Sequence, residues 1–204
     1  QTLGCGPTYG ASEDWFEKLG AFDPAYFGRS CLMTIMIPAW QDGALQPVEK
    51  LMAHKMGLKH RAVSIFVMAE DHILIQQRAL GKYHTPGMWA NSCCTHPHWE
   101  EDPLICARRR LNEELGITGL DLEPRGEVEY RAEVGNGLIE HEVVQVYVAQ
   151  ANFSLPIALN PSEVQAVKWV TRQDLRQELD RNPTAFTPWL HIYMTQHSDL
   201  IFDT

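Results

Sequence analysis

An α+β fold, in which a β-sheet is layered with helices, is predicted by the order of hydrophobic patterns along the chain. Patterns typical of strands come first, one amphipathic helix follows, further strands come next, and helices close the chain. The chain has 204 residues, which is enough for one domain with a real core. Residues 1–35 begin with a Gly- and Pro-rich stretch and carry no chemical motif, so we predict an N-terminal extension there and one domain over residues 36–204.

The first strands are expected on either side of a short turn. Residues 61–68 form a mostly apolar run, which is typical of a central strand covered on both faces. Asp71 and His72 form the predicted turn, and residues 73–78 form a second strand. The centre of the sheet is therefore expected early in the domain.

A helix is expected over residues 103–115. Pro103 suits its first turn, because the amide hydrogen that proline lacks would be unpaired there. Gly116 ends the helix, since glycine readily adopts the left-handed conformation of a helix terminus. The apolar face is formed by residues that recur at helical spacing, namely Leu104, Ala107, Leu111 and Leu115.

Further strands are expected in the second half of the chain. Residues 126–132 and 142–150 flank a loop at 135–137, and residues 163–170 form another strand. Within residues 142–150, side-chain alternation separates Val144, Val146 and Val148 from Val143, Gln145 and Tyr147.

Capping residues mark the expected starts of the remaining helices. Ser12 can cap a short helix over residues 13–19. Thr171 and Thr187 can cap two final helices, and Pro188 suits the first position of the second. Helices from several parts of the chain are therefore expected to cover the sheet.

The composition argues against several classes of protein. The net charge of -9 disfavours a nucleic-acid-binding protein, which usually has a basic face. No apolar run reaches the length of a membrane span, and no segment has the architecture of a signal peptide. The cysteines are odd in number, form no C-x-x-C pair and fit a reducing, cytoplasmic setting; they lie at positions 5, 31, 93, 94 and 106.

The segment over residues 91–97 places two thiols and an imidazole within four consecutive residues, from Cys93 to His96. Turn-forming residues at both ends predict a turn that aims a sulfur and a ring nitrogen into one pocket. The helix over residues 103–115 contains an acidic pair, Glu113–Glu114. Together these groups suggest metal-assisted acid/base chemistry. The alternative is a buried cysteine pair and a solvated helix face.

Histidines and carboxylates elsewhere could complete a metal site. His54 and His60 flank a turn that an intervening glycine implies. Glu140 and Glu142 share one face of a strand, and like charges placed together repel unless a cation or a shared proton relieves them. With His96 these residues give three nitrogens and two carboxylates, which suit Zn²⁺, Mn²⁺ or Fe²⁺. The alternatives are two surface histidines and a solvated strand end.

A basic pair follows the second predicted strand. Arg78 and Lys82 are four residues apart, but Gly81 disfavours a regular helix, so we expect both side chains to line a loop. A guanidinium beside an ammonium forms a good phosphate receptor. The alternative is a pair of surface cations without a ligand.

Taken together, these segments resemble type 1 isopentenyl diphosphate isomerases, which are members of the Nudix superfamily. The resemblance runs from about Met36 to Trp189 and implies a Nudix-like mixed β-sheet sandwiched by helices. It implies an enzyme of isoprenoid biosynthesis that interconverts isopentenyl and dimethylallyl diphosphate by protonation and deprotonation through a tertiary carbocation. The segments that carry it are 76–84, 86–97, 109–116, 130–132 and 140–142.

The resemblance also implies a role for each matching residue. Cys94 matches the catalytic thiol, with Cys93 as its non-catalytic neighbour, and Glu142 matches the catalytic carboxylate. Tyr130 and Trp189 match aromatic residues at the alkene, although as sequence features alone they are plain core aromatics. The positions that match diphosphate contacts are Arg78, Lys82, Arg110 and, more weakly, Lys50.

The cofactors implied by the resemblance are two kinds of metal ion. One tightly bound divalent ion, Mn²⁺ or Zn²⁺, has ligands that match His54, His60, His96, Glu140 and Glu142. A second ion, Mg²⁺, bridges to the diphosphate with the carboxylate that matches Glu114 and with the backbone carbonyl of Cys94. The expected partner is a small prenyl diphosphate substrate, without nucleic acid or membrane, and the oligomeric state is left open.

The general Nudix motif G-x5-E-x7-R-E-U-x-E-E-x-G-U offers a second hypothesis, a pyrophosphohydrolase of a nucleotide or prenyl diphosphate. Aligning Arg109 with the motif's Arg places Glu101 on its first Glu and Glu113–Glu114 on its acidic pair. Arg110 then replaces a Glu that such hydrolases use to hold metal, which weakens this hypothesis. A third hypothesis, a binding module without activity, would have lost the thiol or the carboxylate that this chain keeps.

Overall fold

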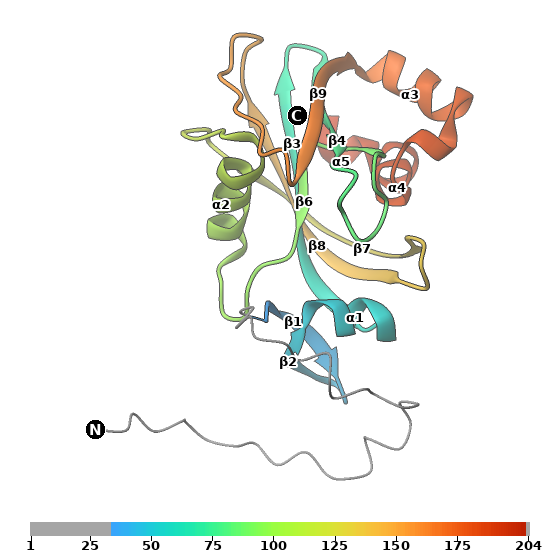
Figure 1. Cartoon of the computed structure of the whole chain (residues 1–204). Coiled ribbons are helices and arrows are strands. Elements are labelled where there is room, and N and C mark those ends of the chain that lie inside the picture. The colour runs from blue at the N-terminus through green and yellow to red at the C-terminus, as the bar shows by residue number, and fades with distance from the viewer. Residues whose placement is uncertain (1–33, 203–204) are drawn as a thin grey trace. The chain divides into compact units, whose positions relative to one another are not determined.

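The structure is a computed structural model that describes residues 34–202 (Figure 1). The helix predicted over residues 13–19, with Ser12 as its cap, lies outside the described residues. So does all but the end of the predicted extension over residues 1–35. Both therefore remain predictions of the sequence.

The described residues form one mixed β-sheet. Strand β3 pairs in parallel with β8, whereas the other paired strands run antiparallel. The strands are β1 (Met36–Gln41), β2 (Ala44–Glu49), β3 (Lys59–Ala69), β4 (His72–Arg78), β5 (Trp89–Ala90), β6 (Cys93–Thr95), β7 (Glu123–Glu133), β8 (Ile139–Gln150) and β9 (Val164–Thr171). The predicted mixed sheet is confirmed.

Helices lie on both sides of this sheet (Figure 1). Helix α2 covers one side, and the helices of the C-terminal part gather on the other. The helices are α1 (Lys50–Met56), α2 (Pro103–Leu115), α3 (Arg172–Arg181), α4 (Pro188–Gln196) and α5 (Ser198–Phe202), with a 3-10 turn at Pro183–Ala185.

Strand β3 supplies both hydrophobic cores, because successive side chains of a strand point to opposite faces. Phe66 and Met68 pack in the core that includes Leu190 and Tyr193 of α4. Val63, Ile65 and Val67 pack in the core that includes residues of α2, namely Cys106, Ala107, Leu111 and Leu115. The long apolar run is thus a central strand covered on both faces, as predicted.

Helix α2 has the bounds that the sequence predicts. Asp102 caps it, since its carboxylate accepts from the amides of Leu104 at 2.8 Å and Ile105 at 3.2 Å. Gly116 ends it with φ of 65°. The apolar face of α2 packs against the sheet, and of its acidic pair Glu114 is the buried member.

Several boundaries differ from the prediction. Strand β7 begins earlier and ends later than predicted, and β8 begins earlier, because their antiparallel pairing runs from Glu123–Val148 to Glu133–Ile139 beside the loop. The predicted turn at Asp71–His72 lies one residue earlier, since His72 already pairs with Ala69. Thr171 caps α3 by accepting from the amide of Asp174 at 3.0 Å. Thr187 stands at the start of α4, but its side chain forms no capping hydrogen bond.

Replacing Gly116 by alanine is expected to destabilise the fold more than the same change at Gly119. Both residues have positive φ, 65° and 77°, so alanine costs roughly 1–2 kcal/mol of strain at either position. At Gly116 the added Cβ would also lie 2.7 Å from the Cβ of Ala158, whereas at Gly119 it would meet nothing within 4 Å. Urea unfolding should show a further loss of at least about 1 kcal/mol for Gly116→Ala. Equal losses would show that Ala158 moves aside freely.

Candidate active site

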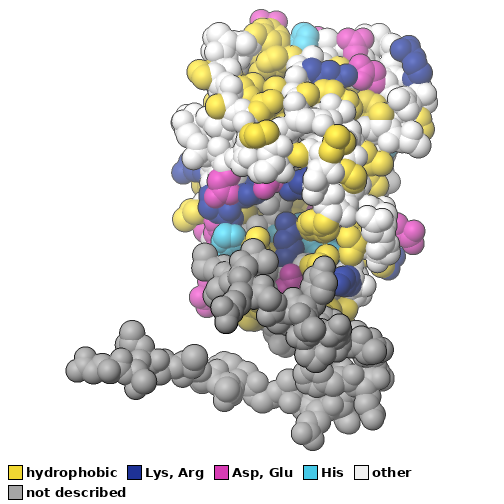
Figure 2. Space-filling model, in the orientation of Figure 1, with side chains coloured by type: hydrophobic (Ala, Val, Ile, Leu, Met, Phe, Trp, Pro, Cys, Tyr) yellow, Lys and Arg dark blue, Asp and Glu magenta, His cyan; other side chains and the backbone are white. Residues whose placement is uncertain are grey.

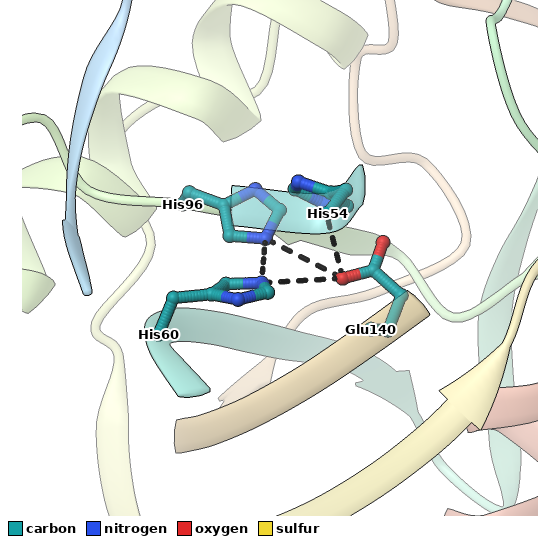
Figure 3. A group of neighbouring side chains, drawn as sticks. All are labelled: His54, His60, His96 and Glu140. Carbon is teal, nitrogen blue, oxygen red and sulfur yellow. Dashed lines mark hydrogen bonds and ion pairs between the residues drawn. The ribbon is translucent and has the colours of Figure 1, made fainter. Parts of the chain in front are cut away.

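Three histidines and a glutamate from separate elements converge in the interior. His54 comes from α1, His60 from β3, His96 from the segment after β6, and Glu140 from β8 (Figure 3). Their side chains are buried, and their ligand atoms all lie within 4.8 Å of one another. Gly57 makes this convergence possible, because its left-handed conformation ends α1 and turns the chain into β3. The interpretation of His54 and His60 as surface histidines is therefore wrong.

The backbone orients two of these imidazole rings. His54 Nδ1 lies 2.6 Å from the carbonyl oxygen of Lys50, and His60 Nδ1 lies 2.7 Å from that of Leu58. A carbonyl only accepts, so both rings carry their hydrogen on Nδ1 when neutral. The lone pairs of both Nε2 atoms then face the cluster, which is the tautomer that a metal ligand needs.

The distances within the cluster suit a shared divalent cation. Glu140 Oε2 lies 3.2 Å from His54 Nε2, 3.4 Å from His60 Nε2 and 3.6 Å from His96 Nε2. His54 Nε2 and Glu140 Oε2 are buried without a hydrogen-bond partner in the described part of the chain. Buried polar atoms are rarely left unpaired. Imidazole nitrogens around a carboxylate suit a divalent metal, so the residues present fit such an ion.

Glu142 lies beside this group. Its Oε1 is 2.8 Å from His96 Nε2 and 3.7 Å from His60 Nε2. Glu140 and Glu142 are both buried, so the interpretation of a solvated strand end is wrong. Burial acts to raise the pKa of Glu140, but the imidazoles of His54, His60 and His96 outweigh it and hold that pKa well below its usual range.

The segment that carries the two thiols is a short strand and not a turn. Strand β6 pairs with β3, so its side chains alternate between the two faces of the sheet. Cys93 is buried in the core beneath α2, whereas Cys94 lies on the other face and lines a narrow pocket. The expectation of a turn is wrong, because pairing with β3 holds this segment in an extended form. The alternative of a buried cysteine pair applies to Cys93 alone.

The pocket contains almost all residues that the sequence singled out. It holds acid/base groups, aromatic residues and basic side chains together. Its lining includes Cys94, Glu142, Tyr130, Trp189, His96, Glu140, Glu114, Arg78, Lys82, Arg110 and Lys50. His54 and His60 are not part of the lining, but they belong to the buried cluster with His96 and Glu140.

Two protonated groups stand near Glu142. Tyr130 donates a hydrogen bond to the Glu142 carboxylate. Burial raises the pKa of the Tyr130 hydroxyl well above its ordinary value, and the charge of Glu142 raises it further. Burial likewise raises the pKa of the Cys94 thiol, with Glu142 as the next cause. The Cys94 sulfur accepts a hydrogen bond from the hydroxyl of Ser64 at 3.5 Å.

Basic side chains form another part of the pocket lining. Arg78 is only 7% exposed and lines the pocket with Lys82, so the two are not plain surface cations, and their binding of a phosphate stays a prediction. Burial lowers the pKa of Lys50, and the positive charge of Lys82 lowers it further. On the face shown in Figure 2, Lys and Arg side chains lie in a band with Asp and Glu, with histidine beside them. In the pocket lining, Lys82 pairs with Glu163 and Arg110 pairs with Glu114, so its positive charge is partly compensated.

The acidic pair of α2 does not act as a pair. Glu114 is buried, bonds Arg110 at 2.6 Å and accepts from Gln76 at 3.0 Å. Glu113 points to the helix surface, because adjacent residues of a helix face different directions, and it bonds Arg110 at 2.8 Å. Glu101 binds Arg109 through both oxygens at 2.7 Å. Among these carboxylates, Glu114 alone is in the described pocket lining.

Sequence reasoning missed three residues at the site. His84 lies in the pocket with Nε2 3.2 Å from Glu140 Oε1, and burial lowers its pKa to about 2. Glu163 pairs with Lys82 and lies 3.3 Å from Arg110. Ser64 contacts Cys94 from β3. No spacing signal marks any of them, because each partner comes from a distant part of the sequence.

Comparison with known proteins gives consistent similarities. A family model described as NUDIX domain matches residues 58–190. The isopentenyl-diphosphate Delta-isomerase of Dinoroseobacter shibae is 59% identical over 172 residues, covering 84% of this chain and 98% of that protein. A protein of the same name from Rhodobacter capsulatus is 58% identical over 167 residues, covering 82% and 95%.

Solved structures share the fold at low sequence identity. A Deinococcus radiodurans protein of known crystal structure gives a TM-score of 0.63 at 15% identity, covering 78% of this chain and 96% of that one. A MutT NUDIX hydrolase from Burkholderia pseudomallei gives 0.54 at 24% identity, covering 68% and 98%. Within residues 34–202, no helix is long and apolar enough to cross a membrane.

Replacing His96 by alanine is expected to abolish tight metal binding. The cluster would lose one of its three imidazoles, and Glu142 would lose its 2.8 Å contact with His96 Nε2. Elemental analysis after dialysis against a chelator should find about one transition metal ion per wild-type chain and far less in His96→Ala. His98→Ala is the matched control, because His98 is exposed and lies two residues further on. Equal metal content in His96→Ala and wild type would remove His96 from the ligand set.

Proposed function

Since this chain belongs to the isopentenyl-diphosphate Delta-isomerase family of NUDIX-domain proteins, we propose that it interconverts isopentenyl diphosphate and dimethylallyl diphosphate. The observation that carries the proposal is that Cys94 and Glu142 line one buried pocket together with basic side chains. A prenyl diphosphate has an apolar, reactive tail and an anionic head. Proton-transfer groups suit the tail, and the cations suit the head.

The proposed reaction moves a double bond by one position. A proton adds to the terminal carbon of the alkene, a tertiary carbocation forms, and a proton leaves the carbon between this cation and the diphosphate end. An alkene is a very weak base, so the acid must lie close and water must be excluded. We assign the two proton positions to Cys94 and Glu142. The roles of donor and acceptor exchange when the reaction runs backward.

Tyr130 and Trp189 are assigned to the reacting end of the substrate. Tyr130 donates to Glu142 and so fixes the direction of that carboxylate. Trp189 is buried and lines the pocket, and an aromatic face stabilises a desolvated cation by about 2 kcal/mol. The Arg78 guanidinium lies 5.4 Å from the Trp189 ring centroid, so this ring already contacts one cation.

We assign the tight divalent metal, Mn²⁺ or Zn²⁺, to His54, His60, His96 and Glu140, with Glu142 as a further ligand. When bound, the ion would supply a fixed positive charge that lowers the proton affinity of the two carboxylates. The inward-facing Nε2 atoms and the unpaired Glu140 oxygen support this assignment.

The diphosphate is assigned to Arg78, Lys82, Arg110 and Lys50. A guanidinium can bind phosphate through two parallel hydrogen bonds, which an ammonium cannot do. A Mg²⁺ ion bound with the diphosphate is assigned to Glu114 and the backbone carbonyl of Cys94. Glu114 is the buried carboxylate of α2 that reaches the pocket, which supports this choice.

Hydrolysis of a diphosphate was the second hypothesis, and the relatives named as isomerases favour isomerisation over it. Arg110 agrees with this, because its guanidinium bonds both Glu113 and Glu114 where a hydrolase would place a further carboxylate. Incubation with isopentenyl diphosphate and Mg²⁺ separates the two activities. The isomerase gives dimethylallyl diphosphate, whereas a hydrolase gives a monophosphate or orthophosphate.

We place this activity in isoprenoid biosynthesis, because both five-carbon diphosphates are precursors of that kind of product. A reducing, cytoplasmic location suits the proposal, since the mechanism needs Cys94 as a free thiol. All assigned residues lie between Lys50 and Trp189, which supports the prediction that residues 1–35 are an extension outside the enzymatic domain over 36–204.

Cys94→Ala is expected to lower kcat by at least about 100-fold, the usual contribution of a general acid or base. Cys93→Ala is the matched control, because the sulfur of Cys93 lies in the core under α2 and not in the pocket. Steady-state rates of both variants, with circular dichroism as a check on folding, decide the assignment. If Cys93→Ala were folded but inactive while Cys94→Ala stayed active, the assignment of the catalytic thiol would be reversed.

Arg78→Lys is expected to reduce kcat/KM by roughly 1.5–3 kcal/mol, the value of lost charged hydrogen bonds. The reason is that an ammonium lacks the planar fork of a guanidinium. Binding energy from the diphosphate also positions the reacting carbons, so kcat falls while KM rises. The amount of tightly bound metal should stay unchanged. Kinetics equal to wild type at saturating Mg²⁺ would show that Arg78 does not bind the diphosphate.

A further inference from the structure

His84 is a buried imidazole of the pocket to which the proposed reaction gives no role. It lies in the loop between β4 and β5 and is 5% exposed. Its Nε2 is 3.2 Å from Oε1 of Glu140. The other oxygen of this carboxylate, Oε2, is the one that faces the imidazoles of His54, His60 and His96. The two oxygens of Glu140 are therefore divided between His84 and the metal cluster.

The neighbours of His84 determine which of its nitrogens carries hydrogen. Nδ1 lies 3.5 Å from Nη2 of Arg78, and a guanidinium nitrogen can only donate. Nδ1 also lies 3.1 Å from the hydroxyl of Thr85, which can donate as well. Nδ1 is thus an acceptor, so the hydrogen resides on Nε2. His84 can therefore donate from Nε2 to Oε1 of Glu140.

The backbone at Thr85 indicates that this arrangement is maintained at a cost. Thr85 is buried and has φ of 45°, in the left-handed region that a β-branched residue rarely adopts. Such strain is of order 1–3 kcal/mol and persists where the surrounding structure imposes it, often at functional sites. Here the strained residue holds its hydroxyl against Nδ1 of His84.

We propose that His84 is a positioning residue for the tight metal, because its Nε2, which lies 3.2 Å from Oε1 of Glu140, holds that oxygen and keeps Oε2 directed at the three imidazoles. This inference rests on the metal assignment proposed above. A carboxylate held at one oxygen presents the other in a fixed orientation, which preorganises the ligand. Partners of this kind typically change metal affinity 10–100-fold, so a loss of roughly this size is expected without His84.

The test measures Zn²⁺ binding to the metal-free full chain by competition with a chelator. His84→Ala removes the contact with Oε1 of Glu140 and should weaken Zn²⁺ binding roughly 10–100-fold. His84→Gln should restore most of the affinity, because its amide nitrogen can take the place of Nε2, whereas the shorter amide of His84→Asn reaches only the place of Nδ1. His141→Ala is the control, since His141 lies next to Glu140 on the opposite face of β8 and pairs with Glu129 at 3.3 Å.

The pattern among these variants distinguishes positioning from other roles. The proposal is supported if His84→Ala and His84→Asn bind Zn²⁺ weakly, His84→Gln recovers the affinity and His141→Ala binds like wild type. Wild-type affinity in His84→Ala overturns it, while the metal assignment stands. Equal weakening in Ala and Gln also overturns it, because the ring itself would then be required. A wild-type chain that binds no Zn²⁺ would overturn the metal assignment together with this inference.

Discussion

The parallel pairing of β3 with β8 is the constraint on which the rest of the site depends. Its register places His60 beside Glu142 and runs unbroken from Lys59 to Met68 on β3. A shift by one residue would turn every side chain of a strand to the opposite face. The buried carboxylates of β8 would then enter the core without the imidazoles that compensate them, and an uncompensated buried charge costs several kcal/mol.

The two faces of β3 serve different parts of the molecule. One face of β3 packs with α2, and the other packs with the C-terminal helices beside the pocket. On the other edge of β3, β6 adds Cys94 opposite Ser64 in the same sheet. Cys94, Glu142, His60 and Glu140 therefore lie on strands of one rigid sheet, which suits preorganised catalysis. His84 and His96 come instead from connections between elements, and His54 comes from α1.

Much of this architecture could be predicted from sequence because it is local. Proline, glycine and a periodic apolar face define α2, and a long apolar run defines β3. Strand β6 could not be recognised in this way, since a segment of three residues has no periodicity and its extended form depends on pairing with β3. The four residues of the buried cluster could be singled out by residue type, whereas His84 and Glu163 could not. Their roles come from tertiary neighbours, and a lone histidine or glutamate carries no spacing signal.

The alternation along β6 has a consequence for how the chain assembles. If β6 slipped by one residue against β3, Cys93 would take the place of Cys94 and the pocket would still contain a sulfur. His96, however, would then point to the opposite face of the sheet, away from the imidazoles of His54 and His60. The pair of cysteines therefore does not distinguish the two registers. The position of His96, two residues after Cys94, does. The four-residue cluster is therefore complete only in the register that the structure shows.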